Sequence, residues 1–467
     1  MPKIWLRGII AATAAAWLLH TVAARAATAD PTSSGSQTPE VARSAPTAGI
    51  DPRAQQEVLG QLAQVLESQY AIEGTAKKLA SFLRAKAKSN AYKKIDNGPE
   101  FARILTEDLY SVAHDKHLRV SFSFTPLPPP PKGPPGPPPQ DVLDQMRKLN
   151  GAIPKAEILD GNVGYMRVNG VPALAVARSA VTAAFAFLHN TDALIIDNRG
   201  NGGGDPSTVA LYVSYLSDGK PFLVNTFHWR AGNRVEEFRT TDLGDLAYGA
   251  HKPVFVLTSP MTFSGGEELT YDLQNLKRAV IVGEVTGGGA NPGGRVPLGT
   301  HFVVNVPQGQ AVNPITGTSW EGVGVKPDIA APSAMALSRA HAQAIEALMG
   351  EAPDARSKTA LKAVAMKLGT IADADSGNAR QLSNAEVLGT YTLETGPGAE
   401  VTIHENGGRL VQHLDGSTDA GLVLLKGNRY RLEGYPEGYV TSFRVADGKT
   451  ELLMESPVGP PTILQKR

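Results

Sequence analysis

The sequence of 467 residues contains no cysteine, so no disulfide bond holds the fold and no cysteine is available for lipid attachment. It also has no excess of charge, because 45 Lys and Arg residues balance 45 Asp and Glu residues. A net charge of zero argues against bulk electrostatic binding to nucleic acid or to an anionic membrane. We therefore expect no nucleic-acid partner.

Long apolar runs are also scarce, and the one clear run stands at the N-terminus. Lys3 and Arg7 precede GIIAATAAAWLLH, and the tripeptide Ala-Arg-Ala at 24–26 has the small-x-small pattern of a signal peptidase site. We expect residues 1–26 to be a cleaved signal peptide; a retained anchor is the alternative. No second run is long enough to cross a membrane, so we expect a periplasmic or secreted protein without stable membrane insertion after cleavage.

The next part of the chain divides by composition. Residues 27–50 are rich in Ser, Thr, Pro and Ala, which predicts a disordered leader. Residues 51–123 predict an N-terminal helical domain, since apolar side chains recur at helical spacing in GPEFARILTEDLYSVAHDKH. The segment FTPLPPPPKGPPGPPPQ then predicts a proline-rich linker over residues 124–155, as a polyproline tether or an exposed loop.

Strands and helices alternate over residues 156–370. EILDGNVGYMRVN predicts a hairpin, and DALIID, KPVFVLT and RAVIVG predict buried strands separated by helical segments. Strand, crossover helix and strand in succession predict an α/β layer with parallel strands. Residues 371–467 differ, because short alternating strands are separated by the turns ENGG, PEG and ADG; they predict a separate antiparallel β-domain, a barrel or a sandwich.

A serine stands at the start of one predicted helix, in SPMTFSGGEELTYDLQNL. Ser264 has two interpretations. It is either an ordinary N-cap, with Glu267 completing a capping box, or a nucleophile on a rigid element. The following Gly265 leaves its amide unshielded, and a helix N-terminus directs partial positive charge at an oxyanion.

A glycine-rich loop follows another predicted strand, in DNRGNGGGDP. Asp205 stands where a dinucleotide-binding loop needs its third glycine, and no Gly-Lys-Ser/Thr follows for a phosphate loop. Two interpretations remain for Gly203 and its neighbours: backbone amides that face a developing negative charge, or a tight turn that needs positive φ.

Two further residues, His117 and Glu321, could take part in catalysis. His117, in AHDKHLRVSF, could be the base that a serine needs, or a solvated surface histidine. With His114 it forms H-x-x-H, but no third ligand at a fitting distance completes a metal site, so we expect no metal. Glu321, in SWEGVGVKPDI, could orient the histidine, or could be a surface acid in a turn.

Three ordered motifs resemble the tail-specific (C-terminal processing) serine peptidases over residues 100–330. The Ser264 segment resembles their nucleophile region, IIDNRGNGGGDP resembles their Asp-x-Arg-x-Asn-x-Gly-Gly oxyanion loop, and EGVGVKPDI resembles their Gly-Val-x-Pro-Asp element. Many members pair the serine with a lysine in a later glycine-rich stretch. Here that stretch, TGGGANPGG, has no lysine.

The sequence is therefore more similar to the branch of tricorn-type proteases and interphotoreceptor retinoid-binding protein. This resemblance implies a crotonase/ClpP-like layered core, with Ser264 as nucleophile, His117 as base and Glu321 as supporting carboxylate. It also implies an oxyanion hole from Gly203 and Gly265. Lys116 stands where the tricorn type has a serine, which leaves Ser121 as a weak candidate for a fourth member. The space between His117 and residue 157 is too short for a PDZ domain.

The sequence thus predicts an exported serine endopeptidase that cleaves peptide or unfolded protein through an acyl-enzyme, without cofactor or metal. The alternative is an inactive peptidase-like module that binds an apolar ligand or a peptide, because fold does not fix function. A crotonase-like acyl enzyme is a third idea that no coenzyme-binding signature supports. The C-terminal β-domain resembles small lipocalin-like modules of exported hydrolases, which says little about its role.

Overall fold

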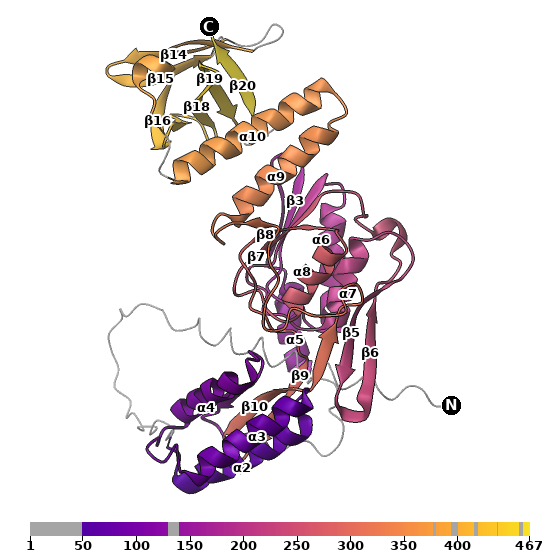
Figure 1. The fold of residues 1–467 in the computed structure, drawn as a ribbon. Helices are drawn as coiled ribbons and strands as arrows, with labels where there is room; N and C mark the ends of the chain where they lie inside the picture. The colour runs from indigo at the N-terminus through magenta and orange to yellow at the C-terminus, as the bar shows by residue number, and fades with distance from the viewer. Residues whose placement is uncertain are drawn as a thin grey trace.

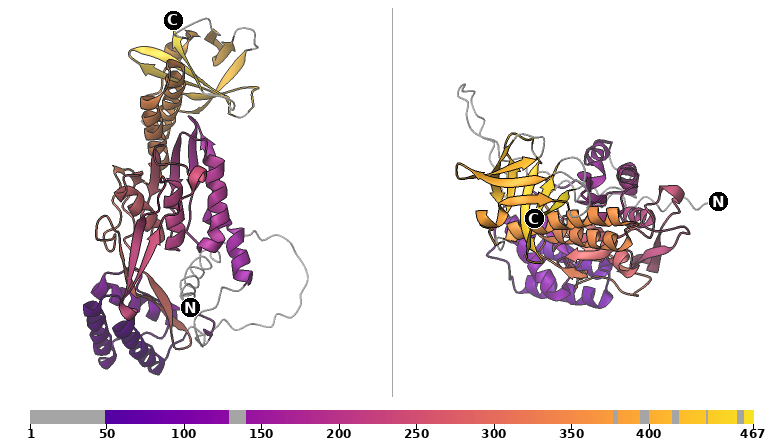
Figure 2. Two further views of the ribbon diagram at one scale, coloured as in Figure 1. Left: turned by 90° about the vertical axis from the view of Figure 1, so that its right-hand side faces the viewer. Right: turned by 90° about the horizontal axis from the view of Figure 1, so that it is seen from above.

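The computed structural model describes residues 49–128, 140–376, 380–393, 400–414, 419–436, 438–456 and 461–467. The predicted signal peptide, nearly all of the predicted leader and the proline-rich run at 129–139 lie outside the described residues. Helices at the N-terminal end, a central α/β layer and a C-terminal β-barrel succeed one another along an elongated molecule (Figure 1). Figure 2 shows the same succession from the side.

The N-terminal part consists of α2 (Pro52–Gln69), α3 (Glu73–Lys88) and α4 (Gly98–Ala113). Asp51 and Asn97 cap α2 and α4 by accepting hydrogen bonds from backbone N–H groups of the first turn, and both helices have proline in that turn. The three helices bury their leucine faces against one another. This confirms the predicted helical region.

One hairpin from the central layer completes the core of these helices. β1 (Arg119–Phe122) pairs with β10 (Phe302–Pro307), which pairs with β9 (Gly293–Leu298), all antiparallel. Apolar side chains of the hairpin belong to the same buried cluster as the helices: Leu298, Phe302, Val304 and Val306. The helical domain is therefore built from two separate stretches of the chain.

The central layer is a six-stranded sheet in the order β12-β8-β7-β4-β3-β2. Its strands are parallel except β2, which pairs antiparallel with β3. Their bounds are β2 Lys155–Leu159, β3 Val163–Arg167, β4 Ala193–Asp197, β7 Val254–Thr258, β8 Val280–Gly283 and β12 Ile329–Ala330.

Helices cover both faces of this sheet, which explains why its strands are continuous apolar runs. α6 (Leu174–Leu188), α7 (Pro206–Tyr215) and α8 (Gly265–Asn275) pack on one face. α9 (Ala336–Glu351) and α10 (Ala355–Ser376) pack on the other. The predicted α/β class is confirmed.

Smaller elements border the layer. β5 (Leu223–Trp229) and β6 (Arg234–Arg239) form a second sheet with β11 (Gly309–Val312), which lies at its edge. Single turns of 3₁₀ helix occur at Ala231–Asn233 and Gly244–Leu246. Between β1 and β2 the described residues hold only α5 (Gln140–Lys148) and a 3₁₀ turn at Asn150–Ala152.

The C-terminal part is a closed barrel in which antiparallel strands follow in chain order, preceded by α11 (Asn384–Val387). The strands are β13 Gly389–Thr392, β14 Val401–Asn406, β15 Arg409–Leu414, β16 Ala420–Lys426, β17 Arg429–Leu432, β18 Val440–Ala446, β19 Lys449–Glu455 and β20 Thr462–Lys466.

α10 joins the barrel to the central layer. Its Ala363 and Met366 pack against Leu453 of the barrel. Lys367 of α10 lies 2.8 Å from a carboxylate oxygen of Asp160 and 3.4 Å from one of Glu455, so it links both parts. The predicted boundary after residue 370 falls inside this helix. Among the described helices, none combines the length and apolarity needed to cross a bilayer.

Candidate active site

Ser264 lies on a sharp turn between β7 and α8. It is the N-cap residue of α8, but its φ of 53° and ψ of −125° differ from the extended backbone usual at that position. A positive φ is uncommon for a residue with a side chain, and such strain gathers at functional sites. The turn half-buries Ser264 and places it at the positive end of the helix dipole.

Glu267, in the first turn of α8, ties this turn to the loop after β8. Its carboxylate accepts the Ser264 N–H at 3.0 Å, the Gly288 N–H at 2.6 Å and the Gly289 N–H at 2.8 Å, and also the hydroxyl of Thr286. Burial raises the pKa of Glu267, whereas these hydrogen bonds favour its charged form. The sequence suggested only the capping contact to Ser264.

The glycine loop packs directly on the nucleophile turn. Gly203 has φ 100°, and a Cβ added to it would lie 2.6 Å from Ser264 Cβ and 2.7 Å from Gly265 N, so only glycine fits. Its N–H, which the motif assigns to an oxyanion, donates to Asn201 Oδ1 at 2.9 Å. The backbone carbonyl of Asn201 accepts the Phe263 N–H at 2.9 Å, which fastens the loop to the turn.

His117 reaches the same place from the helical domain. It follows α4, precedes β1, and is 8% exposed. Its ring packs on the ring of Phe263 at a centroid distance of 4.6 Å. A Cβ added to Gly289 would lie 2.8 Å from His117 Cε1. The structure thus brings His117 beside the Ser264 turn, although His117 follows α4 of the helical domain and Ser264 precedes α8 of the central layer.

Glu321 lies behind His117. Its Oε2 accepts the Ala290 N–H at 2.6 Å and the Asn291 N–H at 3.0 Å, and its Oε1 is buried without a partner. Burial, and then the nearby charge of Asp115, raise the pKa of Glu321 to about 7.

Asp115, two residues before His117, was not among the predicted site residues. A donor atom each from Asp115, His117 and Glu321 lies within 4.8 Å of the others. Asp115 is 2% exposed, and its Oδ2 accepts the hydroxyl of Tyr70 at 3.0 Å. The signal in the sequence was a carboxylate two residues from a candidate base, but its partner Tyr70 lies 45 residues away, at the C-terminal end of α2.

Comparison with known proteins fits this arrangement. Residues 162–331, which contain Ser264 and Glu321, match peptidase family S41. Residues 52–150, which contain His117, match the N-terminal domain of peptidase S41 in eukaryotic IRBP. The chain therefore contains a peptidase family S41 domain together with an N-terminal domain of that family. The prediction of a tail-specific serine peptidase family is thereby confirmed.

Individual relatives are distant. A carboxy-terminal-processing protease of Bartonella bacilliformis is 29% identical over 178 residues, which are 37% of this chain and 39% of that protein. The chain therefore spans well under half of that relative. The photosystem II D1 C-terminal processing protease has a TM-score of 0.37 at 16% identity, covering 60% of this chain and 93% of that one. Tricorn protease has a TM-score of 0.41 at 12% identity, and the match covers 68% of this chain and 37% of that one.

Asp115, His117 and Glu321 are residue types that bind metals, but this S41 site offers few free donor atoms. Glu321 Oε2 holds two N–H groups, and Asp115 accepts from three donors. Only Glu321 Oε1 and His117 Nδ1 are buried without partners, one atom short of the usual three protein ligands. His114 is exposed and packs on Tyr110 instead.

Lys116 and Ser121 are the two other positions that were compared with the tricorn type. Lys116, which stands where the tricorn type has a serine, donates through its Nζ to the Gly287 carbonyl at 2.5 Å. Ser121, the candidate fourth member, is exposed on β1.

The charge state of His117 suits a base. Burial lowers its pKa to about 4, the charge of Asp115 acts in the opposite direction, and Arg119 lowers it further. The imidazole is therefore neutral at neutral pH and has one nitrogen free to accept a proton.

A groove of about 400 Å³ opens beside the S41 site, with the edge strand β11 as one wall. It reaches Glu321 and Asn291, and it is otherwise lined by Ile72, His228, Gln310, Ala311, Val312, Gly317, Thr318 and Ser319.

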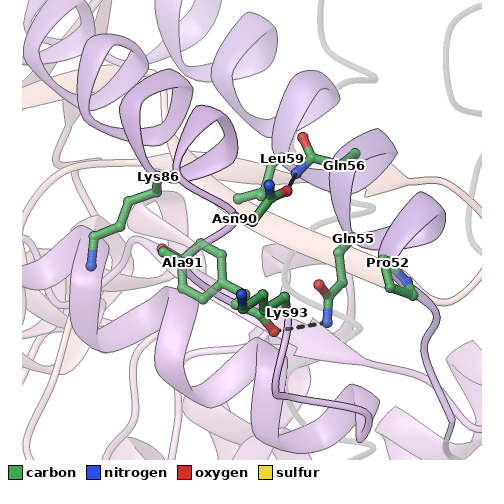
Figure 3. Close-up of a pocket in the computed structure, with 9 residues that line it drawn as sticks. Pro52, Gln55, Gln56, Leu59, Lys86, Asn90, Ala91 and Lys93 are labelled. Carbon is green, nitrogen blue, oxygen red and sulfur yellow. Dashed lines mark hydrogen bonds between the residues drawn. The ribbon is translucent and has the colours of Figure 1, made fainter.

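Figure 3 shows a different hollow, of about 10 Å³, inside the helical domain. It has room for about one water molecule, and Gln55 and Gln56 are among the residues that line it.

Proposed function

We propose that this S41 protein is a serine peptidase in which Ser264 is the nucleophile, His117 the base and Glu321 a supporting carboxylate. The observation that carries the proposal is the contact through Phe263, which places a neutral imidazole beside a strained serine turn. Either feature alone has an ordinary structural explanation, whereas both together support the assignment of a nucleophile and a base.

In the proposed reaction, His117 removes the proton of Ser264 Oγ while that oxygen attacks the scissile carbonyl carbon. The imidazolium then gives its proton to the leaving amine, which leaves an acyl-enzyme. Water, deprotonated by His117, attacks the acyl carbon and returns Ser264. Since Nδ1 of His117 faces the buried side, Nε2 is the nitrogen that serves Ser264.

The developing oxyanion needs hydrogen-bond donors. The Gly265 N–H at the start of α8 is the first one in this proposal. The Gly203 N–H becomes the second when it leaves Asn201 or shares its bond with the substrate oxygen. Catalytic hydrogen bonds often reach their final geometry only when substrate is bound.

The proposed substrate is an extended peptide or an unfolded protein segment. The groove beside β11 supports this, because an edge strand offers backbone groups that an added strand can pair with. An exported location, after removal of residues 1–26, belongs to the same proposal. It is tested by the N-terminal mass of the mature protein.

The experiment compares the protein with its Ser264→Ala variant on casein and on fluorogenic peptides, together with fluorophosphonate labelling. We expect the variant to lose hydrolysis and labelling while its circular dichroism is unchanged. Ser338→Ala is the matched control, because Ser338 is a half-buried serine on α9 whose hydroxyl donates to the Met335 carbonyl. Hydrolysis that persists in the Ser264→Ala protein would contradict the proposal.

A second candidate is a binding module without hydrolytic activity. The match of residues 52–150 to a domain of IRBP favours it, because IRBP, the interphotoreceptor retinoid-binding protein, is named for binding a ligand. Stoichiometric binding of an apolar ligand, with no labelling of Ser264, would support this alternative.

A further inference from the structure

We propose that Asp115 is a positioning residue that holds His117 in place and supplies the negative charge facing its imidazole, while Glu321 chiefly shapes the loop at 290–291. This inference rests on the proposed function and deepens it. It assigns the charge partner of the base to a residue other than the carboxylate that the family resemblance selects.

The position of Asp115 is fixed from three directions. Its Oδ1 accepts the backbone N–H of His117 at 2.9 Å, so the carboxylate and the base form one local unit. Its Oδ2 accepts the hydroxyl of Tyr70 at 3.0 Å and the side-chain N–H of Asn291 at 3.4 Å. Tyr70 ends α2, and Asn291 belongs to the loop that passes Ser264. Asp115 therefore locks His117 between the helical domain and the central layer.

Glu321 is held differently. Its Oε2 is occupied by the N–H groups of Ala290 and Asn291. Its Oε1 and His117 Nδ1 are both buried without a hydrogen-bond partner, so the two are not bonded to each other in this structure. Glu321 thus orders the loop at Ala290 and Asn291 but makes no hydrogen bond to Nδ1 of the His117 ring.

The electrostatics agree with this geometry. The charge that raises the pKa of His117 against burial is that of Asp115. Asp115 also contributes to raising the pKa of Glu321 to about 7, because two neighbouring carboxylates resist ionising together. The ionisable groups around this cluster are Asp115, Glu321, Glu267, Tyr70, Arg119 and Lys116.

The consequence for the reaction is specific. When Ser264 Oγ gives its proton to His117, the new imidazolium is stabilised by a standing negative charge on Asp115. The proton stays on His117 until it passes to the leaving amine, and Asp115 takes no proton itself.

The first test reads the ionisation of His117 directly, by NMR of imidazole nitrogens in the Ser264→Ala protein. The His117 signal is assigned by its loss in a His117→Gln protein. We expect Asp115→Asn to weaken proton binding by His117 about tenfold or more, because an opposite charge is removed at close range. Glu321→Gln should have a smaller effect. An unchanged His117 titration in Asp115→Asn, or a larger shift in Glu321→Gln, would overturn the inference.

The second test uses a matched pair of tyrosines and remains valid if Asp115→Asn fails to fold. Tyr70 donates to Asp115, and Tyr92 donates to Asp108 at 2.6 Å within the same helical domain. Tyr70→Phe should lower kcat about threefold to tenfold with KM unchanged, in proportion to one lost hydrogen bond. Tyr92→Phe should leave both constants unchanged. Equal effects of the two substitutions would show that the Tyr70 bond is merely structural.

Failure of this inference is distinguishable from failure of the proposed function. If Ser264→Ala retains hydrolysis, the peptidase assignment fails, whatever the NMR titration shows. If Ser264→Ala is inactive but Asp115→Asn leaves the His117 titration unchanged, only the role of Asp115 is lost.

Discussion

The imidazole of His117 packs on the phenyl ring of Phe263, the residue that precedes Ser264, with the ring centroids 4.6 Å apart. His117 comes from the helical domain and Ser264 from the central layer, so this ring contact joins two parts of the fold. The proposed base and nucleophile are thus aligned by an aromatic spacer rather than by neighbouring positions in one element.

Phe263→Ala should therefore lower kcat about tenfold to a hundredfold, because a misplaced base loses reaction geometry. Phe263→Leu, which keeps an apolar surface under the imidazole, should lose less. Steady-state kinetics on a fluorogenic peptide, with thermal unfolding as the control for folding, measures both. Equal activity of the alanine and wild-type proteins would show that the ring contact has no catalytic consequence.

Gly289→Ala tests the same alignment from the opposite side. An added methyl group would lie 2.3 Å from Phe263 Cζ and 2.8 Å from His117 Cε1, so the two rings must move. We expect at least about a tenfold loss of kcat/KM, by the same sensitivity of catalysis to position. Gly369→Ala is the control, since an added Cβ there meets nothing within 4 Å. Full activity in Gly289→Ala would mean that the rings tolerate displacement.

Glu267→Gln should weaken both stability and activity. The carboxylate now accepts from Ser264, Thr286, Gly288 and Gly289, and an amide would present a donor to one or more of those groups. The loss in free energy of unfolding should be on the order of 2 kcal/mol, the cost of buried donors left unsatisfied. Urea unfolding and peptide hydrolysis measure it. A variant that matches the wild type in both assays would contradict the role of Glu267 as the link between turn and loop.

The three proposed catalytic residues illustrate what local pattern can predict. Ser264, His117 and Glu321 each stand in a short motif, and the elements that carry them follow from apolar periodicity. Asp115 and Glu267 are different, because their roles depend on partners that are remote in sequence. Tyr70 lies 45 residues from Asp115, and Asn291 lies 176 residues from it. No spacing rule reveals such contacts.

Gly203 shows a second limit. Its motif predicts a turn with positive φ, and the turn is present. The direction of its N–H toward Asn201 depends on one side-chain rotamer, which the sequence does not specify. The joining of the β9–β10 hairpin to the helical core was also missed, since apolar alternation does not say which core a strand enters.

Stability should decline toward alkaline pH because of a buried acid on α8. Burial raises the pKa of Glu268 from 4.5 to about 8, and burial also raises the pKa of Asp272, one turn later on α8. Between pH 4.5 and about pH 8, Glu268 keeps a proton in the folded protein that it releases in the unfolded chain. The free energy of unfolding therefore falls as pH rises through this window, and the loss is complete above about pH 8.

Glu268→Gln should reduce that dependence and raise the melting temperature at pH 8.5 by roughly 2 °C or more relative to wild type. At pH 5 the two proteins should differ less, because Glu268 is then protonated in the folded state. Melting curves across this range measure the difference. Parallel curves for the two proteins would exclude Glu268 as the source.

The shared core of the helices and the β9–β10 hairpin also has a consequence for synthesis. A chain emerging from the ribosome presents His117 first, Ser264 later and the hairpin after that, with Glu321 last of the group. Until the hairpin has been made, the helices lack part of their apolar interior. The order of translation thus leaves the proposed site incomplete until the central layer has been made.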